Sequence, residues 1–291
     1  MRVRLRTRAV IPGRINSVVR VHAWTDAVTS PRRPEGHTLH RLAIDHRKDL
    51  AGEVVHVSSP QGRFDATPLE GELVTDVEAW GKHLFYRFES GAILHVHLGL
   101  FGRFRKHRQP APAPRGQIRL RLETERSCLD LSGPTACELL GPDEYTALLA
   151  RLGPDLLRKE ASRADAWKRV KKSRRALGAL LLDQSVLSGV GNVYRAEGLF
   201  VAGLHPEIPG VELESRDFTR LWKTLVGMLH DGVRDRRIIT VKHFDAAEGR
   251  AARRERTWVY KQRLCKRCGD AIRVWELGLR TMYACETCQR R

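Results

Sequence analysis

Two Cys-x-x-Cys pairs near the end of the chain place the strongest constraint on its fold. Sixteen residues separate the pair Cys265 and Cys268 from the pair Cys285 and Cys288. Each pair can present two thiolates to one ion, so the four together would complete a tetrahedral Zn²⁺ site without an open position. We expect one structural zinc ion at the base of a β-hairpin. An iron–sulfur cluster is the competing use of four cysteines.

The charge of the chain indicates a polyanionic partner. The 52 Lys and Arg residues outnumber the 34 Asp and Glu residues, which gives a net charge of +18. The excess does not depend on residues 1–33, although that segment holds eight Arg and one Asp. Such a surface is typical of nucleic-acid-binding proteins, and a merely solubilising surface is the alternative. No apolar run reaches the roughly 18 residues of a membrane helix, so we expect a cytoplasmic, nucleoid-associated protein with no membrane contact.

The hydrophobic pattern changes along the chain. After Pro34, apolar residues recur at helical spacing as far as Leu50, and Gly52 ends this predicted helix. Short alternating runs then predict strands of an antiparallel sandwich, at residues 53–59, 73–80, 83–90, 92–99 and 117–124.

From about Asp143 the pattern becomes helical, and the cysteine pairs follow it. We therefore expect an α+β multidomain protein. Its predicted units are a basic extension outside the working protein (1–33), an N-terminal helix with a β-sandwich (34–142), a helical domain (143–258) and a β-hairpin zinc finger (259–291).

A glycine-rich turn lies inside the predicted helical domain. In LLDQSVLSGVGNVYRAEGLF, residues 181–200, Gly189 and Gly191 permit a tight turn between two helices, and Asn192 can cap the second. Free N–H groups at that helix start would form a site for one DNA phosphate. An ordinary helix cap explains the same residues equally well.

Four further residues have both a functional and a structural interpretation. Lys82, at the head of an apolar strand, could face a phosphate or extend into solvent. Leu100 and Phe101 occupy a turn, where they could form a wedge for a base stack or a corner of the core. Arg280 could bind phosphate from the zinc hairpin, or be a solvated turn residue.

Together these pieces resemble the formamidopyrimidine-DNA glycosylase / endonuclease VIII family, from Pro34 to Gln289 and in the same order. The motifs that carry the resemblance are PEGHT, WGKHLF, HLGLFG, LLDQSVLSGVGNVYRAE, LFVAGLHP and CKRC…GLRTMYACETCQ. The family fold implied is an N-terminal helix on a β-sandwich, a helical domain with a helix-two-turn-helix, and a zinc finger, with DNA in the cleft between them.

The resemblance also implies an activity. In this family the proline amine that begins the mature chain attacks C1′ of a damaged nucleoside, and the resulting Schiff base permits β- and then δ-elimination. Pro34 would be this nucleophile, and Glu35 would be the general acid/base. The implied function is a bifunctional DNA glycosylase/AP lyase of base excision repair. Its partner would be double-stranded DNA with oxidised bases or abasic sites, and it would act as a monomer.

Four DNA contacts are implied as well. Lys82 would hold a phosphate beside the lesion, and Asn192 and Arg280 would bind the backbone of the kinked duplex. Leu100 would fill the gap that the flipped nucleotide leaves. The segment from His243 to Arg256 is where we expect a lesion-covering loop.

The chain departs from the family pattern at three places. Thr38 stands where a second Glu is common, and CLDLSGPTACELL (128–140) replaces the Arg/Phe void-filling loop of the purine-lesion branch. The latter favours the endonuclease VIII-like branch, which prefers oxidised pyrimidines.

The third departure is that Arg33 precedes Pro34, whose nitrogen is a non-nucleophilic amide unless residues 1–33 are absent. We expect Pro34 to be exposed in the working enzyme. The alternatives are a protein of the same fold that binds damaged or abasic DNA without lyase activity, and an RNA-binding zinc-ribbon protein.

Overall fold

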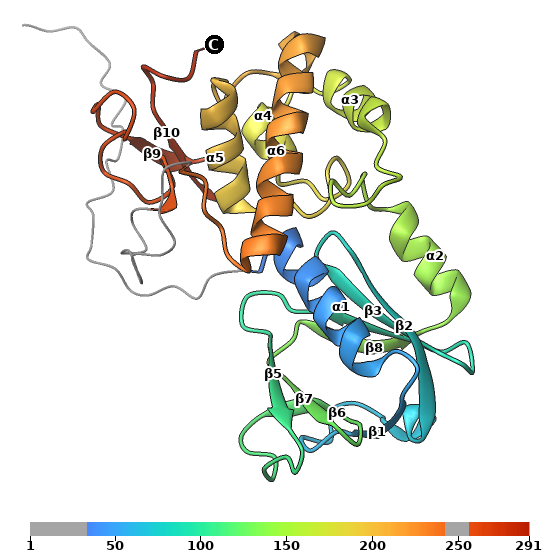
Figure 1. The fold of residues 1–291 in the computed structure, drawn as a ribbon. Helices are drawn as coiled ribbons and strands as arrows, with labels where there is room; N and C mark the ends of the chain where they lie inside the picture. Colours follow the sequence, from blue (N-terminus) through green and yellow to red (C-terminus); the bar gives the residue numbers. More distant parts are fainter. Residues whose placement is uncertain (1–33, 242–255, 291) are drawn as a thin grey trace, which may run out of the picture.

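The computed structural model describes residues 34–241 and 256–290. Figure 1 shows a sheet domain below and a group of helices with a small hairpin above, with helix α1 between them. The predicted basic extension lies outside the described residues, as does the predicted lesion-covering loop apart from Arg256. Within the described ranges, no helix has the length and apolar character that crossing a membrane requires.

Helix α1 (Gly36–Leu50) follows the predicted apolar spacing. It packs on the sheet domain and buries Leu39, Ala43 and Leu50 in that domain's core. The chain turns at Gly52, which has φ +82° and donates its N–H to Val74 O at 2.8 Å. The helix therefore runs from the core of the sheet domain to Glu35, the residue directly before its first turn.

Eight antiparallel strands form the sheet domain in the order β5-β7-β6-β1-β2-β3-β4-β8. Strand β1 belongs to both halves of the sheet, because its first residues pair with β2 and its last residues pair with β6. The sheet thus has two halves, as the predicted sandwich requires. The strands are β1 (Val54–Ser58), β2 (Glu72–Trp80), β3 (His83–Phe88), β4 (Ile93–His97), β5 (Arg103–Arg108), β6 (Ile118–Glu123), β7 (Ser127–Ser132) and β8 (Ala136–Leu140), with a 3-10 turn η1 (Thr67–Leu69).

The alternation of apolar residues did not predict strands β5, β7 and β8. The structure gives a physical reason for each omission. Strand β5 is an edge strand of charged residues that are mostly exposed, so it has no apolar alternation. Strand β7 is buried along nearly its whole length, and its Asp130 is accommodated there by an ion pair with Arg121 at 2.7 Å. Strand β8 is the opposite edge strand and is only half-buried.

Within residues 142–241, the helical part contains five helices and a 3-10 helix. The helical pattern expected from about Asp143 is interrupted near residue 173, because the carbonyls of Ser173 and Arg175 accept from the N–H groups of Val211 and Gly210 instead of continuing a helix. The elements are α2 (Pro142–Ala150), α3 (Arg163–Lys171), α4 (Leu177–Leu180), α5 (Asn192–Ala202), η2 (Gly210–Glu212) and α6 (Ser215–Asp235).

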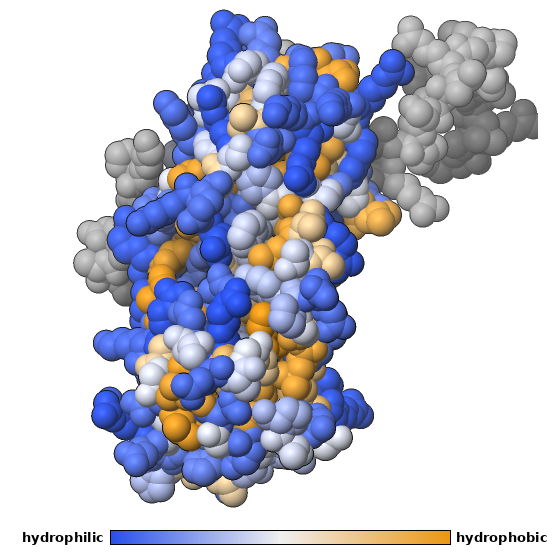
Figure 2. All heavy atoms as spheres, turned by 90° about the vertical axis from the view of Figure 1, so that its right-hand side faces the viewer, coloured by the Kyte–Doolittle hydropathy of each residue, from blue (hydrophilic) through white to orange (hydrophobic). Residues whose placement is uncertain are grey.

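The C-terminal hairpin consists of β9 (Arg273–Glu276) and β10 (Thr281–Ala284), as predicted for the cysteine module. Its Met282, Tyr283 and Ala284 are buried in the same core as α5 and α6. The predicted α+β fold is therefore confirmed, and the hairpin shares a core with the helices. Figure 2 shows a mostly hydrophilic outer face with apolar areas between the charged residues.

Candidate active site and metal centre

The buried carboxylate of Glu35 joins the two parts of the molecule. Glu35 is 3% exposed and immediately precedes α1. Its Oε1 accepts from Val193 N at 2.8 Å, and its Oε2 accepts from Gly191 N at 3.1 Å and Tyr194 N at 3.3 Å. These donors are the free N–H groups at the start of α5. The anion site predicted there exists, but Glu35 occupies it in place of a DNA phosphate.

Asn192 does not cap α5, contrary to the prediction. It is the first residue of the helix, and Gly191 takes the cap position. The Asn192 side chain instead donates Nδ2 to Thr281 O at 2.9 Å, and its Oδ1 accepts from Arg195 Nη2 at 2.6 Å. Because Glu35 satisfies the helix start, the Asn192 side chain is available to bind the C-terminal hairpin.

Two glycines allow this close approach. A Cβ on Gly191 would lie 2.4 Å from Glu35 Cδ, and a Cβ on Gly36 would lie 2.8 Å from Gly189 Cα. The Gly36 N–H also donates to Gly189 O at 2.8 Å. Gly36 of PEGHT and the glycine-rich turn are therefore in direct backbone contact. A side chain at Gly36 or Gly191 would push the two segments apart.

Lys82 lies against the same turn. Its Nζ donates to Val190 O at 2.7 Å, and Gly81 before it has φ +60°. Burial raises the pKa of the Glu35 carboxyl, while the positive charge of Lys82 and the three N–H donors partly oppose that rise. Pro34 is partly exposed and precedes Glu35 directly. The structure thus brings together Pro34, Glu35 and Lys82, which are 48 positions apart at most along the sequence.

The turn after β4 lies at the same end of the sheet as Lys82, because His97 pairs with His83. Leu100 is half-buried in this turn, whereas Phe101 is 68% exposed. The N–H of Gly102 closes the turn by donating to Leu98 O at 2.9 Å. An aromatic side chain is thus exposed to solvent at the end of the sheet that carries Lys82.

Arg280 is exposed at the turn of the C-terminal hairpin, and the hairpin backbone near it is bound by Arg195. The fully buried Arg195 donates to Leu277 O at 2.9 Å and to Thr281 O at 3.0 Å, and burial lowers its pKa to about 10. Sequence reasoning missed this residue. Its only signal was a charged residue one position before Ala196, in a helix whose other residues are mostly apolar.

Glu197 is a second buried charge that the sequence reasoning missed. Its carboxylate accepts from the N–H groups of Trp258, Val259 and Tyr260 at 2.7–2.9 Å, and from the Thr240 hydroxyl. It therefore attaches the segment that leads into the cysteine module to the middle of α5.

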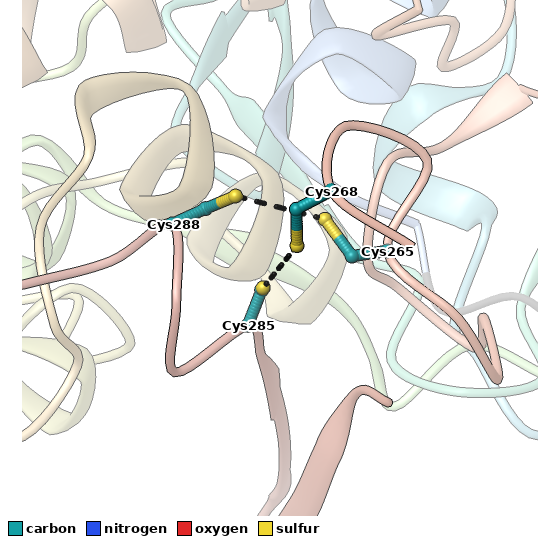
Figure 3. Close-up of side chains that lie close together, drawn as sticks. All are labelled: Cys265, Cys268, Cys285 and Cys288. Carbon is teal, nitrogen blue, oxygen red and sulfur yellow. Dashed lines mark hydrogen bonds between the residues drawn. The ribbon is translucent and has the colours of Figure 1, made fainter. Parts of the chain in front are cut away.

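The four paired cysteines converge as predicted. The Sγ atoms of Cys265, Cys268, Cys285 and Cys288 all lie within 4.8 Å of one another (Figure 3). The Cys268 and Cys285 sulfurs are 3.4 Å apart, and those of Cys265 and Cys288 are 3.9 Å apart. All four thiols are free of disulfides. A four-thiolate set of this kind fits a tetrahedral metal ion.

Comparisons with known proteins agree with this arrangement. Residues 27–135 match the N-terminal domain of formamidopyrimidine-DNA glycosylase, and residues 152–243 match its H2TH domain. "Endonuclease 8 1" of Mycobacterium tuberculosis (strain H37Rv) is 44% identical over 266 residues, which cover 88% of this chain and 99% of that protein. The chain belongs to the formamidopyrimidine-DNA glycosylase family.

Other family members are more distant. "Probable endonuclease 8 2" of Streptomyces coelicolor is 34% identical over 268 residues, which cover 88% of this chain and 94% of that protein. The Lactococcus lactis formamidopyrimidine-DNA glycosylase, solved with DNA containing an abasic site, superposes with a TM-score of 0.73 at 20% identity, over 88% of this chain and all of that one. The family fold is thus retained at low sequence identity.

Proposed function

We propose that this protein is a bifunctional DNA glycosylase/AP lyase of base excision repair. The observation that carries the proposal is the buried Glu35 carboxyl, which lies next to Pro34 and within electrostatic reach of Lys82. The named activities of the family members support the same reaction class. The protein would act as a monomer on double-stranded DNA in the cytoplasm, at the nucleoid.

Pro34 would be the nucleophile once residues 1–33 are absent. Its secondary amine would attack C1′ of the damaged nucleoside, and the bond from C1′ to the base would break, the base leaving with a proton. The bond from C1′ to the ring oxygen O4′ would break as O4′ takes a proton, so that the sugar ring opens and an iminium ion forms. This iminium withdraws electrons, so the C2′ proton can leave and the 3′ phosphate is eliminated; the 5′ phosphate follows by δ-elimination. An N-terminal amine has a pKa of about 8, so it is partly uncharged at neutral pH.

Glu35 would be the general acid/base of base release. Burial raises the pKa of this carboxyl, so it keeps a proton to a higher pH than an exposed glutamate does. That proton can pass to the sugar ring oxygen as the bond to the base breaks. The three N–H groups of α5 hold the carboxylate that remains.

DNA would be bound by residues from four parts of the fold: the turn between β2 and β3, the turn after β4, helix α5 and the C-terminal hairpin. Lys82 would hold the phosphate beside the lesion, and Asn192 and Arg280 would contact the backbone of the bent duplex. Leu100 would enter the gap left by the flipped nucleotide. The exposure of Phe101 supports adding it to this wedge, because stacking on neighbouring bases would bury its ring.

The four cysteines would bind one structural Zn²⁺ ion. Such an ion supplies no chemistry to the reaction, since all its ligands come from the protein. Its role would be to fold the hairpin that carries Arg280.

Oxidised pyrimidines are the proposed preferred substrates. The segment 128–140 supplies strands β7 and β8 with Gly133, Pro134 and Thr135 between them, and so carries no Arg/Phe pair. Two of the relatives above also carry the name endonuclease 8.

Excision from defined duplexes tests the proposed function. The protein should release an oxidised pyrimidine and cut the strand on both sides of the lost base, with little action on undamaged DNA. Binding of abasic duplex without cleavage would favour the lyase-deficient alternative. Equal binding of undamaged RNA would favour an RNA-binding protein.

A further inference from the structure

A buried aspartate lies behind the proposed active site. Asp155, in the loop between α2 and α3, is 1% exposed. Its Oδ2 accepts from His40 Nε2 at 2.6 Å and from Gly81 N at 2.7 Å, and its Oδ1 accepts from Leu157 N at 3.0 Å. One carboxylate therefore connects α1, the turn that carries Lys82, and the helical part.

The loop of Asp155 is also attached to the glycine-rich turn. Asp155 forms an isolated parallel bridge with Ser188, whose N–H donates to Pro154 O at 3.0 Å. The Ser188 hydroxyl donates to Gly153 O at 2.8 Å. Asp155 is thus fixed to the segment whose Val190 carbonyl accepts from Lys82.

Burial alone would raise the pKa of Asp155, but the hydrogen bonds and charge of His40 and the N–H groups of Gly81 and Leu157 outweigh it and lower the pKa. The group is therefore a carboxylate at neutral pH. A buried charge of this kind holds its donors firmly, because releasing one would leave it without compensation. The Asp155 carboxylate can therefore hold the turn at Gly81 in place.

We propose that Asp155 and His40 are positioning residues that hold the Lys82 turn and α1 in register with the glycine-rich turn. The inference rests on the proposed function, since it assigns to this pair the placement of Lys82 relative to Glu35. The pair would touch neither DNA nor the reacting atoms. Misplacement by about 1 Å can reduce a rate on the order of a hundredfold.

Asp155→Asn is the first test, with Asp130→Asn as its matched control. Asp130 is likewise a buried aspartate, 4% exposed, with an arginine partner at 2.7 Å and His107 at 3.1 Å, but it belongs to strand β7. Both variants should lose thermal stability. In the protein whose Pro34 amine is exposed, only Asp155→Asn should lower the single-turnover rate, by about tenfold to a hundredfold. Its affinity for a duplex carrying a tetrahydrofuran abasic analogue should fall much less, because Lys82 is one of several proposed DNA contacts.

Substitutions of His40 test the same contact from the other side. His40→Gln keeps a donor near the position of Nε2 and should retain the single-turnover rate, whereas His40→Leu should lower it. Equal rates for the two variants, or an equal loss in Asp155→Asn and Asp130→Asn, would overturn the inference.

A measurement that needs no activity separates this inference from the proposed function. In the full chain, acetylation of Lys82 should be slow, because its amine is held on the Val190 carbonyl, and mass spectrometry can follow it. Asp155→Asn should accelerate acetylation of Lys82 several-fold, and Asp130→Asn should not. If Lys82 reacts at the same rate in all three proteins, the positioning role is wrong even when excision is observed.

Discussion

The Oε1 atom of Glu35 lies 2.8 Å from Val193 N, so a carboxylate from the N-terminal domain satisfies the first turn of a helix in the other part of the molecule. This contact makes the protonation of Glu35 depend on how the two parts sit against each other. The carboxyl therefore keeps its raised pKa only while the two parts stay packed together.

Glu35→Gln should abolish base release and leave binding of lesion-containing DNA intact. The amide retains an oxygen for the α5 N–H groups but cannot deliver a proton, and general acid catalysis contributes about 10²–10⁴-fold to rates. Single-turnover excision and equilibrium binding on the same duplex measure the two effects. Unchanged excision would remove Glu35 from the acid/base role.

The rate of base release should depend on pH in a bell shape. Deprotonation of the Pro34 amine, with an ordinary pKa of about 8, raises the rate as pH increases. Loss of the Glu35 proton lowers the rate as pH rises through its elevated pKa. A pH–rate profile without a declining alkaline side would contradict a protonated Glu35.

Gly191→Ala should separate the two domains locally. Its Cβ would lie 2.4 Å from Glu35 Cδ, and forced overpacking costs about 1–3 kcal/mol. Excision should fall with stability. Gly227→Ala is the control, because that exposed position in α6 has open space around its Cβ, and alanine there should be neutral or stabilising.

Much of this site could be predicted from the sequence. The features that could not be predicted depend on contacts between distant parts of the chain or on exposure at the edge of the sheet. The cysteine pairs, the turn at Gly189 and Gly191, and PEGHT are local motifs with local chemistry. The partners of Glu35 could not be predicted, because Val193 lies 158 positions away and contributes only backbone. Strand β5 was missed because edge exposure removed its alternation.

Buried charges formed the second group of missed residues. Arg195 and Glu197 are fully buried, whereas charged side chains are usually expected at the surface. Their partners are mostly backbone groups of the hairpin and of the segment before it. No sequence pattern specifies such partners, so these two residues were assigned only from the fold.

Arg280→Ala should weaken DNA binding and reduce the slope of log K against log salt by about 1, as expected for the loss of one phosphate contact. The hairpin should stay folded, because Arg195 binds the carbonyl of residue 280 and its neighbours rather than the Arg280 side chain. Arg273→Ala on the same hairpin is the control, since Arg273 is paired with Glu286 at 2.8 Å. An equal slope in both variants would mean that Arg280 does not contact phosphate.

Zinc removal should unfold the hairpin. Zinc binding to such modules is worth on the order of 10 kcal/mol, and without it Met282 and Tyr283 would leave the core they share with α5. Metal analysis should find one zinc per chain. Chelation should then lower the thermal midpoint and DNA affinity together, whereas full stability of a metal-free protein would contradict a structural zinc.

The central claim is that the amine of Pro34 reacts with DNA, and borohydride trapping tests it most directly. The protein isolated from its own cells should form a stable cross-link with abasic duplex DNA, and peptide mapping should place that cross-link on Pro34 as the first residue of the chain. A cross-link on a lysine, or none at all with residues 1–33 still attached, would contradict the account.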